Sequence, residues 1–354
     1  MVILLISMVA GLGFLMLYSA GGGSYQPWAE KQMIRYAFGM VILLTIAVTN
    51  IRFWMQYAYY IYGFSLIMLI AVEVAGSIGM GAQRWIDLYI IRLQPSELVK
   101  ITLIIALARY FHIMGTQQTI RATDLVVPAL LVLAPTVLVL KQPDLGTAIL
   151  LMLIGLAIIF WAGLSYWIIL GLAVLVSSSL PVLWTMLHQY QRERILTFLN
   201  PERDPFGAGY HILQSKIAFG SGGLMGRGFL EGSQSHLDFL PEKQTDFIFS
   251  MFCEEFGFTG GLILIGLYAI IIAYTYSVGL SARNTFCRLV SLGFGWMLFV
   301  YMFVNMAMVM GLLPVVGIPL PLVSYGGTSM MTLMMGFGLL FCADLSKDQR
   351  IGKA

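Results

Sequence analysis

Stretches without any charged residue constrain this chain more than any other feature. Two of them, Leu145 to Gln191 and Leu289 to Ala343, are longer than the roughly 20 apolar residues of one membrane-crossing helix. The first has a break at WAGLSY (161–166). The second breaks at GLLPVVGIPLPLVSYGGTS (311–329), where prolines and glycines exclude a continuous helix. Since only 10% of the residues are charged, against about 25% in soluble domains, an integral membrane protein is predicted.

Charged and turn residues divide the chain into about ten predicted membrane spans. Apolar runs of this length favour helices over a β-barrel, whose strands would alternate apolar and polar residues. The fold class is therefore predicted as an all-α membrane protein, with residues 1–354 as a single polytopic membrane domain. The run at 2–20 is interpreted as the first span and not as a signal peptide. The spans are expected at residues 2–20, 33–50, 55–75, 95–113, 124–140, 145–162, 164–187, 246–278, 286–312 and 322–343.

The connection from His188 to Thr245 is predicted to be a long extracytoplasmic loop between the seventh and eighth spans. It is far longer than the other connections and rich in glycine, tyrosine, phenylalanine and charge, which favours an ordered loop close to the membrane. Its GSGGLMGRG segment (220–228) looks like a phosphate-binding loop. Because it follows no strand and lacks a terminal GKS or GKT, a dinucleotide site is not predicted.

The basic residues give the predicted orientation. An even number of spans places both termini on one side, and the short loops there hold more Lys and Arg than those opposite. Both termini are therefore expected in the cytoplasm and the long loop outside. The cytoplasmic residues counted are Arg52, Arg109, Arg121, Arg283, Arg288, Lys347, Arg350 and Lys353, and those opposite are Lys31, Arg35, Arg84, Arg92 and Lys141.

Net charge and cysteine spacing exclude two classes of function. The formal net charge of +3 is too small to indicate nucleic acid as a partner. Cys253, Cys287 and Cys342 lie far apart, without a CxxC or histidine spacing, so neither a metal-binding motif nor a disulfide framework is predicted.

Two ionisable residues at the start of the fourth span are expected on one helix face. Pro95 suits a first helical turn, and Glu97 and Lys100 then lie at positions i and i+3. They either form a structural ion pair or line a polar cavity that opens outward, since ionisable groups within a membrane are functional candidates. The spacing alone favours neither interpretation.

Asp144 and Asp246 each stand where a predicted span begins. Taken alone, Asp144 is better explained as a cap for the amides of residues 145–147. Asp246 could follow an N-cap at Thr245 and favour the helix dipole by ~0.3–1 kcal/mol. Glu254 and Glu255 lie two turns further on, so this account does not explain them.

One feature is shared by the polar groups Glu97, Lys100, Lys141, Asp144 and Asp246 and by the basic residues of the long loop: all are expected at the outer membrane face. A carboxylate beside lysines and arginines there suits a substrate with a lipid tail in the bilayer and an anionic head at the surface. Basic groups would hold a diphosphate, and the carboxylate would accept a proton from an attacking hydroxyl.

Eight motifs in the chain resemble the successive signatures of the SEDS family (shape, elongation, division and sporulation). They occur in that family's order, cover the chain almost end to end, and are more similar to the elongation member than to the division member. The motifs are GAQRW, QPSELVK, QPDLGT, YQRERI, DPFGAGYHILQSKIAFGSGGLMGRG, FLPEKQTDFIF, EEFG and GLLPVVGIPLPLVSYGGTS.

The resemblance implies a ten-helix membrane glycosyltransferase that polymerises peptidoglycan during cell elongation and rod-shape maintenance. It would join lipid II disaccharides into β-1,4 glycan strands by an inverting displacement, with release of undecaprenyl diphosphate. The family's essential carboxylate lies in TDFIF, so Asp246 is the expected catalytic base. The expected substrate-binding residues are Trp85, Glu97, Lys100 and Asp144, and the further candidates for holding the diphosphate are Lys141, Arg192, Arg194, Lys216 and Lys243.

The resemblance also implies partners and a location. The partners are lipid II, the undecaprenyl diphosphate-linked glycan, a class B penicillin-binding protein (a transpeptidase) and other proteins of the elongation complex. The location is the bacterial cytoplasmic (inner) membrane, with an outward-facing active site. No cofactor is required by the sequence, and a divalent cation (Mg²⁺ or Mn²⁺) bridging carboxylate and diphosphate is neither required nor excluded.

Two other classes of function are considered. A lipid II flippase would carry charges across the membrane depth and on the inner side, whereas here they gather at the outer face. A non-catalytic scaffold would tolerate loss of Asp246 and keep its partner contacts.

Overall fold

The computed structural model describes the chain except residues 80–81, 88–91, 116–121, 165–166, 169, 172–173, 175–177, 179–183, 186–188, 205–206, 237–241, 350–351 and 353–354. Two compact units are distinguished and are described separately. The first comprises Met1–Ala37, Pro181–Ile272 and Phe299–Gly326, and the second comprises Phe38–Leu180, Ala273–Leu298 and Gly327–Ala354. Helices α2 (Ala29–Ala47), α11 (Ile248–Ser281) and α12 (Thr285–Val309) contribute residues to both.

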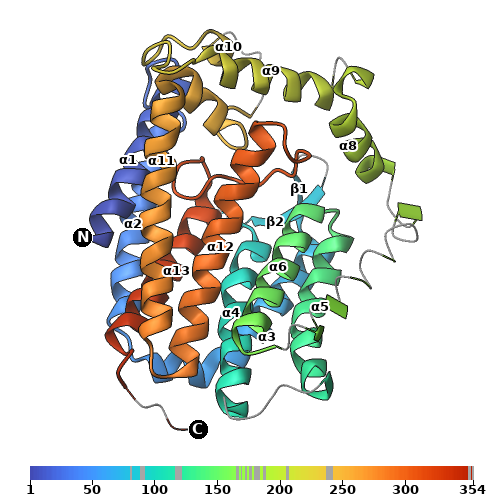
Figure 1. Ribbon diagram of the computed structural model, residues 1–354, viewed down its shortest axis with the longest axis vertical. Helices are drawn as coiled ribbons and strands as arrows, with labels where there is room; N and C mark the ends of the chain where they lie inside the picture. Colours follow the sequence, from blue (N-terminus) through green and yellow to red (C-terminus); the bar gives the residue numbers. More distant parts are fainter. Residues whose placement is uncertain are drawn as a thin grey trace. The chain divides into compact units, whose positions relative to one another are not determined.

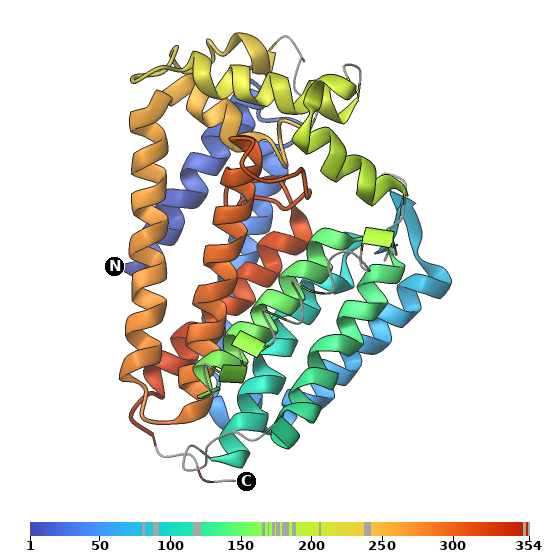
Figure 2. The ribbon, with the colours of Figure 1, turned by 45° about the vertical axis from the view of Figure 1, so that its right-hand side comes forward.

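In the second unit, helix α4 (Pro95–Met114) is the central element. All residues from Val99 to Ala108 are buried. Helices α3 (Ile51–Ala75), α5 (Val126–Lys141) and α6 (Leu145–Trp161) pack against it, as Figure 2 shows. Pro95 occupies the first turn as predicted, where its missing N–H leaves no helical hydrogen bond unmade.

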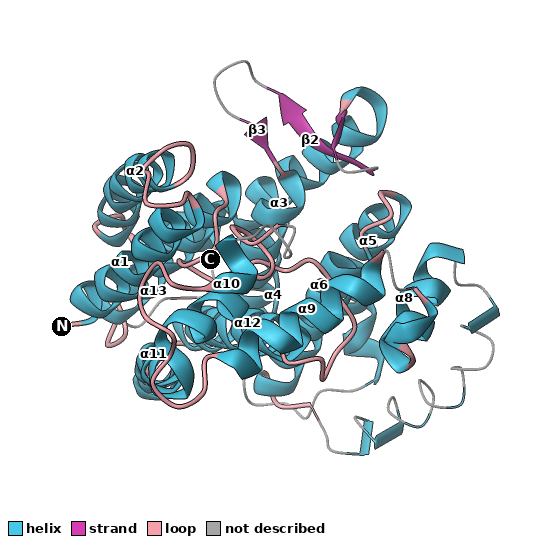
Figure 3. Ribbon diagram, turned by 90° about the horizontal axis from the view of Figure 1, so that it is seen from above, coloured by secondary structure: helices cyan, strands magenta, loops and turns pink. Residues whose placement is uncertain are grey.

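A small antiparallel sheet of the second unit lies between α3 and α4 in the chain. It consists of β1 (Ser77–Gly79), β2 (Ala82–Asp87) and β3 (Arg92–Leu93), with β2 in the middle and Ser77 opposite Trp85. Figure 3 shows the strands in magenta beside the end of α3. These strands are not predicted from the sequence, since β1 and β3 are very short and the residues of β2, AQRWID, do not alternate between apolar and polar.

The first unit contains α1 (Val2–Ala20), the first part of α11 and the helices of the long loop. Figure 1 shows α1 and α11 side by side, and the Ser19 hydroxyl on α1 donates a hydrogen bond to Glu255 Oε1 on α11. The long loop is ordered into α8 (Gln189–Leu199), the 3₁₀ turn η2 (Pro201–Arg203), α9 (Ala208–Ser221) and α10 (Ser233–His236).

Helix α11 is interrupted at Gly257, and the glycine-rich segment 222–228 is bonded into the interruption. Gly257 has φ 67° and ψ −167°, a conformation that favours glycine. The backbone carbonyls that lose their helical partners accept from the loop, and the displaced amides donate to it. The N–H groups of Arg227 and Gly228 donate to the carbonyls of Glu254 and Glu255, and those of Phe258 and Thr259 donate to Gly223 and Leu224, all at 2.9–3.1 Å.

The predicted class, an all-α membrane protein, is confirmed. Among the described residues, six helical segments are long and apolar enough to cross a membrane: α1, α3, α5 with the short 3₁₀ turn before it (Ala122–Leu125), α11, α12 and α13 (Gly327–Leu345). The span predicted at 164–187 falls largely outside the described residues. The expectation of a single membrane domain stays a prediction.

Candidate active site around Asp246

Asp246 lies in a turn just before helix α11, in the first unit. The helix begins at Ile248, and the hydroxyl of Thr245 donates to the side-chain Oε2 of Glu242, at 3.1 Å, within the turn. Asp246 is therefore not a first-turn acid behind a Thr245 cap, as the simple structural interpretation supposed. The carboxylate is partly buried.

The backbone of Asp246 is held by Asn305, a fully buried residue of α12. The amide Nδ2 of Asn305 donates to the Asp246 carbonyl at 3.0 Å and to the Ile318 carbonyl at 2.7 Å. This one side chain joins the Asp246 turn to the irregular segment 311–326. Because both N–H donors of this buried amide need a carbonyl partner, the two hydrogen bonds fix the distance between the Asp246 turn and segment 311–326.

The SYGG motif holds the other side of the same turn. The Ser324 hydroxyl donates to the Thr245 carbonyl at 2.7 Å, and the Tyr325 N–H donates to the Gln244 carbonyl at 2.8 Å. Gln32 at the start of α2 donates to the Ser324 carbonyl at 3.0 Å and is itself buried. The Asp246 turn is thus fixed by hydrogen bonds to two separate parts of the chain, and Gln32 in turn holds one of them.

Gly317 lies directly beside the Asp246 carboxylate. A Cβ at this position would lie 3.3 Å from Asp246 Oδ2, and the glycine has a φ of +76°. Both the space and the backbone conformation therefore favour glycine. Glycine therefore places no side chain over this face of the carboxylate.

Burial raises the pKa of Asp246 to about 6, with a further contribution from the nearby charge of Glu242, while Arg194 opposes the rise. No side-chain or backbone donor among the described residues forms a hydrogen bond to the carboxylate. A carboxylate with a pKa close to the working pH and a free oxygen is suited to general-base chemistry.

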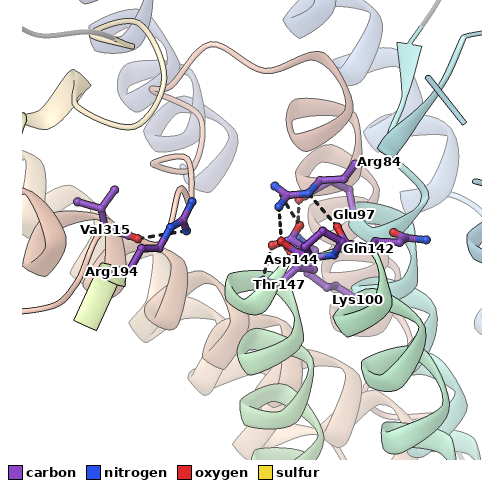
Figure 4. Close-up of polar contacts among 9 residues, drawn as sticks. Arg84, Glu97, Lys100, Gln142, Asp144, Thr147, Arg194 and Val315 are labelled. Atoms are coloured by element: carbon purple, nitrogen blue, oxygen red, sulfur yellow. Dashed lines mark hydrogen bonds and ion pairs between the residues drawn. The ribbon is translucent and has the colours of Figure 1, made fainter. Parts of the chain in front are cut away.

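The basic candidates of the first unit differ in their surroundings. Arg194 on α8 is exposed, and its Nη1 donates to the Val315 carbonyl at 3.4 Å, two residues from Gly317 (Figure 4). Arg192 donates to the Thr185 carbonyl at 2.6 Å, and Lys243 is buried. Lys216 is exposed, and its side chain lies against Gly311. Of these four, the charge of Arg194 is the one that acts on the pKa of Asp246.

In the second unit, Glu97 and Lys100 form a buried ion pair. Lys100 Nζ lies 2.5 Å from Glu97 Oε1, and the two side chains are 1% and 8% exposed. The predicted i, i+3 spacing is confirmed. Both residues make further polar contacts, so the pair is part of a larger network.

Asp144 caps helix α6, as the sequence suggested. Its Oδ1 accepts from the Thr147 N–H at 3.1 Å and its Oδ2 from the Thr147 hydroxyl at 2.9 Å. Figure 4 shows Arg84 above this cap, with Nη1 at 3.7 Å from Asp144 Oδ2 and Nη2 donating to the Pro143 carbonyl. Lys141 is exposed at the end of α5, and Trp85 is partly buried on β2.

Several residues of the site were not predicted. Glu242, Asn305, Ser324 and Gln32 act on Asp246 or its turn, and Arg84 pairs with Asp144. Asn305 gives a usable signal, because it is a lone amide inside the apolar run of α12. Gln32 and Ser324 give none, since their partners are backbone carbonyls far away in the sequence.

Comparisons with known proteins match almost the whole chain. The family model described as the FtsW, RodA and SpoVE cell cycle protein matches residues 1–349. The peptidoglycan glycosyltransferase MrdB of Escherichia coli (strain K12) is 47% identical over 328 residues, which are 92% of this chain and 88% of that protein.

Two solved structures extend the match to three dimensions. One is described as "Structural coordination of polymerization and crosslinking by a peptidoglycan synthase complex". Its matching chain has a TM-score of 0.86 and 32% identity, and the match covers 99% of this chain and 98% of that one. The rod shape-determining protein RodA of Thermus thermophilus has a TM-score of 0.73 and 28% identity, covering 99% and 97%.

Proposed function

The chain belongs to the FtsW/RodA/SpoVE (SEDS) family as a peptidoglycan glycosyltransferase of the elongation type, and we propose that Asp246 is its general base. The substrate proposed is lipid II, whose disaccharide is added to a growing glycan chain. The observation that carries the proposal is a partly buried carboxylate with a pKa of about 6, beside the open face that Gly317 leaves.

The proposed step is one inverting displacement. Asp246 accepts the proton of the 4-hydroxyl of the acceptor GlcNAc as that oxygen attacks the anomeric carbon of the donor chain. The bond from this carbon to the undecaprenyl diphosphate breaks, and the electron pair leaves with the diphosphate. The α-linked donor becomes a β-1,4 glycan bond, and the proton remains on Asp246 until water removes it.

Arg194 is the diphosphate ligand that its position supports best. Its charge acts on Asp246, it is exposed, and a guanidinium can bind two phosphate oxygens at once. Trp85, Glu97, Lys100, Lys141, Asp144, Arg192, Lys216 and Lys243 remain proposed substrate-binding residues. For Glu97, Lys100 and Asp144, the contacts also support a structural role.

A divalent cation such as Mg²⁺ fits the residues near Asp246 only if the substrate supplies further ligands. The described residues contain no group of three or more His, Cys, Asp and Glu side chains that could hold a metal, but Glu242 and Asp246 are close enough to interact. Such oxygen ligands suit Mg²⁺ or Mn²⁺, which would neutralise charge on the diphosphate. Loss of activity on chelation, with recovery on adding Mg²⁺, would support this proposal.

The proposed partner is a transpeptidase of the class B penicillin-binding type, with other proteins of the elongation complex. The similarity to a chain from a peptidoglycan synthase complex supports it. Co-purification of the two proteins is the direct measurement, and failure to associate under any membrane-like condition would contradict it.

The protein is a multi-pass membrane protein, and we propose that it lies in the bacterial cytoplasmic (inner) membrane with both termini inside. The excess of arginine in the loops on that side supports this orientation. A Ser233→Cys variant with its native cysteines replaced should react with an impermeant thiol reagent on intact spheroplasts. A cysteine at the C-terminus should react only after lysis, and the reverse pattern would overturn the orientation.

Asp246→Asn tests the proposed base. Asparagine keeps the size of the side chain and cannot accept the proton, so polymerisation of labelled lipid II should fall by about 10²–10⁴-fold. Glu202→Gln is the control, because it removes one negative charge from an exposed position of the long loop and should leave the activity unchanged. A near wild-type rate for Asp246→Asn would rule out Asp246 as the base, and no polymerisation by the wild-type protein under any condition would favour a flippase or a scaffold.

A further inference from the structure

A cavity of about 600 Å³ opens in the second unit between the start of α3 and the end of α4. Its lining residues are Met55, Gln56, Tyr57, Tyr60 and Arg109. Pockets of this size accommodate small ligands or the head of a lipid. All five residues belong to one unit, and none is among the substrate-binding candidates.

Arg109 brings a charge into this cavity that no carboxylate balances. Its Nη1 donates to the Gln56 carbonyl, and its guanidinium lies 4.6 Å from the centre of the Tyr59 ring. Among the described residues it forms no ion pair, whereas Arg84, Arg92 and Arg283 each have a carboxylate partner. The guanidinium is therefore fixed in place and still able to bind an anion.

From its distance to the helix ends, the cavity is expected at the depth of lipid phosphates. Gln56 and Arg109 are each about five residues from a helix end, or roughly 7–8 Å, which is close to the thickness of one headgroup layer. Phe53, Trp54, Tyr57 and Tyr60 form an aromatic belt of the kind that marks the edge of a bilayer.

The apolar face of α3 continues from the cavity along the helix. Tyr57, Tyr60, Phe64 and Ile67 are all exposed and follow one another at helical spacing. An acyl chain can lie along this face while a phosphate reaches Arg109. An inorganic anion could bind to Arg109 but would leave the apolar face of α3 uncovered, so a phospholipid fits the site better.

We propose that this cavity binds the headgroup of an anionic phospholipid, with the phosphate on Arg109 and an acyl chain along α3. The site is separate from the glycosyltransferase chemistry and does not depend on the role of Asp246. It holds a structural lipid at the membrane edge of the helix pair α3 and α4.

Native mass spectrometry of the purified protein with added phosphatidylglycerol tests the proposal. Arg109→Gln should weaken retention by at least about fivefold, because it removes the basic residue that lines the cavity and contacts the phosphate. Arg52→Gln is the matched control, because Arg52 is exposed at the same helix end and does not line the cavity. It should retain lipid as the wild type does.

Gln56→Glu gives a second variant that keeps Arg109 and its contacts. The new carboxylate would serve as a counter-ion for the guanidinium and should weaken phosphatidylglycerol binding in the same way. Phosphatidylcholine should bind at least about fivefold more weakly than phosphatidylglycerol, and inorganic phosphate alone should not displace the lipid. Equal loss in Arg52→Gln, equal binding of phosphatidylcholine, or displacement by inorganic phosphate would each overturn the proposal.

Discussion

Glu97 and Asp144 of the second unit and Asp246 of the first have opposite surroundings. In the second, Glu97 lies 2.5 Å from the ammonium of Lys100 and Asp144 accepts two hydrogen bonds from Thr147, so both charges are compensated. In the first, Asp246 has its backbone held firmly while its carboxylate receives no hydrogen bond from the described residues. The protein thus stabilises two acids for the fold and leaves a third reactive at the cost of stability.

Glu97→Gln should give the largest effect on stability. The ammonium of Lys100 would remain buried without its carboxylate, which costs about 3–5 kcal/mol in comparable buried pairs. Thermal or denaturant unfolding in detergent measures it. Asp87→Asn is the control, since its pair with Arg92 is largely exposed and should contribute at most about 1 kcal/mol. Unchanged stability with lost polymerisation would instead place Glu97 in the substrate site and end the contrast with Asp246.

The pH dependence of polymerisation should follow Asp246. The base is active only when ionised, so the rate should fall about tenfold for each pH unit below about 6. Because Glu242 raises this pKa, Glu242→Gln should move the midpoint to lower pH. A rate that is independent of pH between 5 and 7 would show that the ionisation of Asp246 does not limit the reaction.

Asp246 should also make the stability of the protein depend on pH, in the direction opposite to its effect on the polymerisation rate. The folded pKa of about 6 lies above 3.8, the ordinary pKa of an aspartate, so the folded state binds more protons between these values. Stability contributed by the protonated form is therefore lost as the pH rises from about 4 to about 6. Asp246→Asn should remove this dependence and leave the protein at least as stable at neutral pH.

Asp144→Ala should give the smallest effect, a loss of about 0.5–2 kcal/mol from the cap of helix α6. Asp144→Asn separates the two roles, because asparagine caps as well as aspartate but carries no charge. Full activity in the asparagine variant would confirm that Asp144 is structural. Lost polymerisation at unchanged stability would show that Asp144 belongs functionally with Asp246.

Much of the fold follows from the sequence because apolar runs of about 20 residues have one stable form in a bilayer. The first span was predicted at 2–20 and observed at Val2–Ala20, and the fourth was predicted at 95–113 and observed at Pro95–Met114. The bonding of the glycine-rich segment 222–228 into α11 could not be predicted, because the sequence does not show that a helix is interrupted where a distant loop binds to it.

The acidic residues of the candidate site could be picked out from the sequence, but the residues that hold them in place could not. Spacing placed Glu97 and Lys100 on one helix face without deciding between an ion pair and a cavity, and it favoured Asp144 as a cap. Glu254 and Glu255 had no account, and the structure gives one: Glu254 accepts from the Gln234 N–H at 2.8 Å, and Glu255 from the Ser19 hydroxyl. Contacts between side chains and distant backbone, such as those of Asn305, depend on the folded path and leave no periodic pattern.

The interruption at Gly257 also decides how force passes through α11. In an unbroken helix, a twist or a pull travels from turn to turn through the backbone hydrogen bonds. Here the bonds of that turn lead into segment 222–228 instead. A displacement of the chain beyond Phe258 therefore also moves segment 222–228, which passes it on to Glu254 and Glu255, so the long loop is mechanically coupled to the helix turn that follows Asp246.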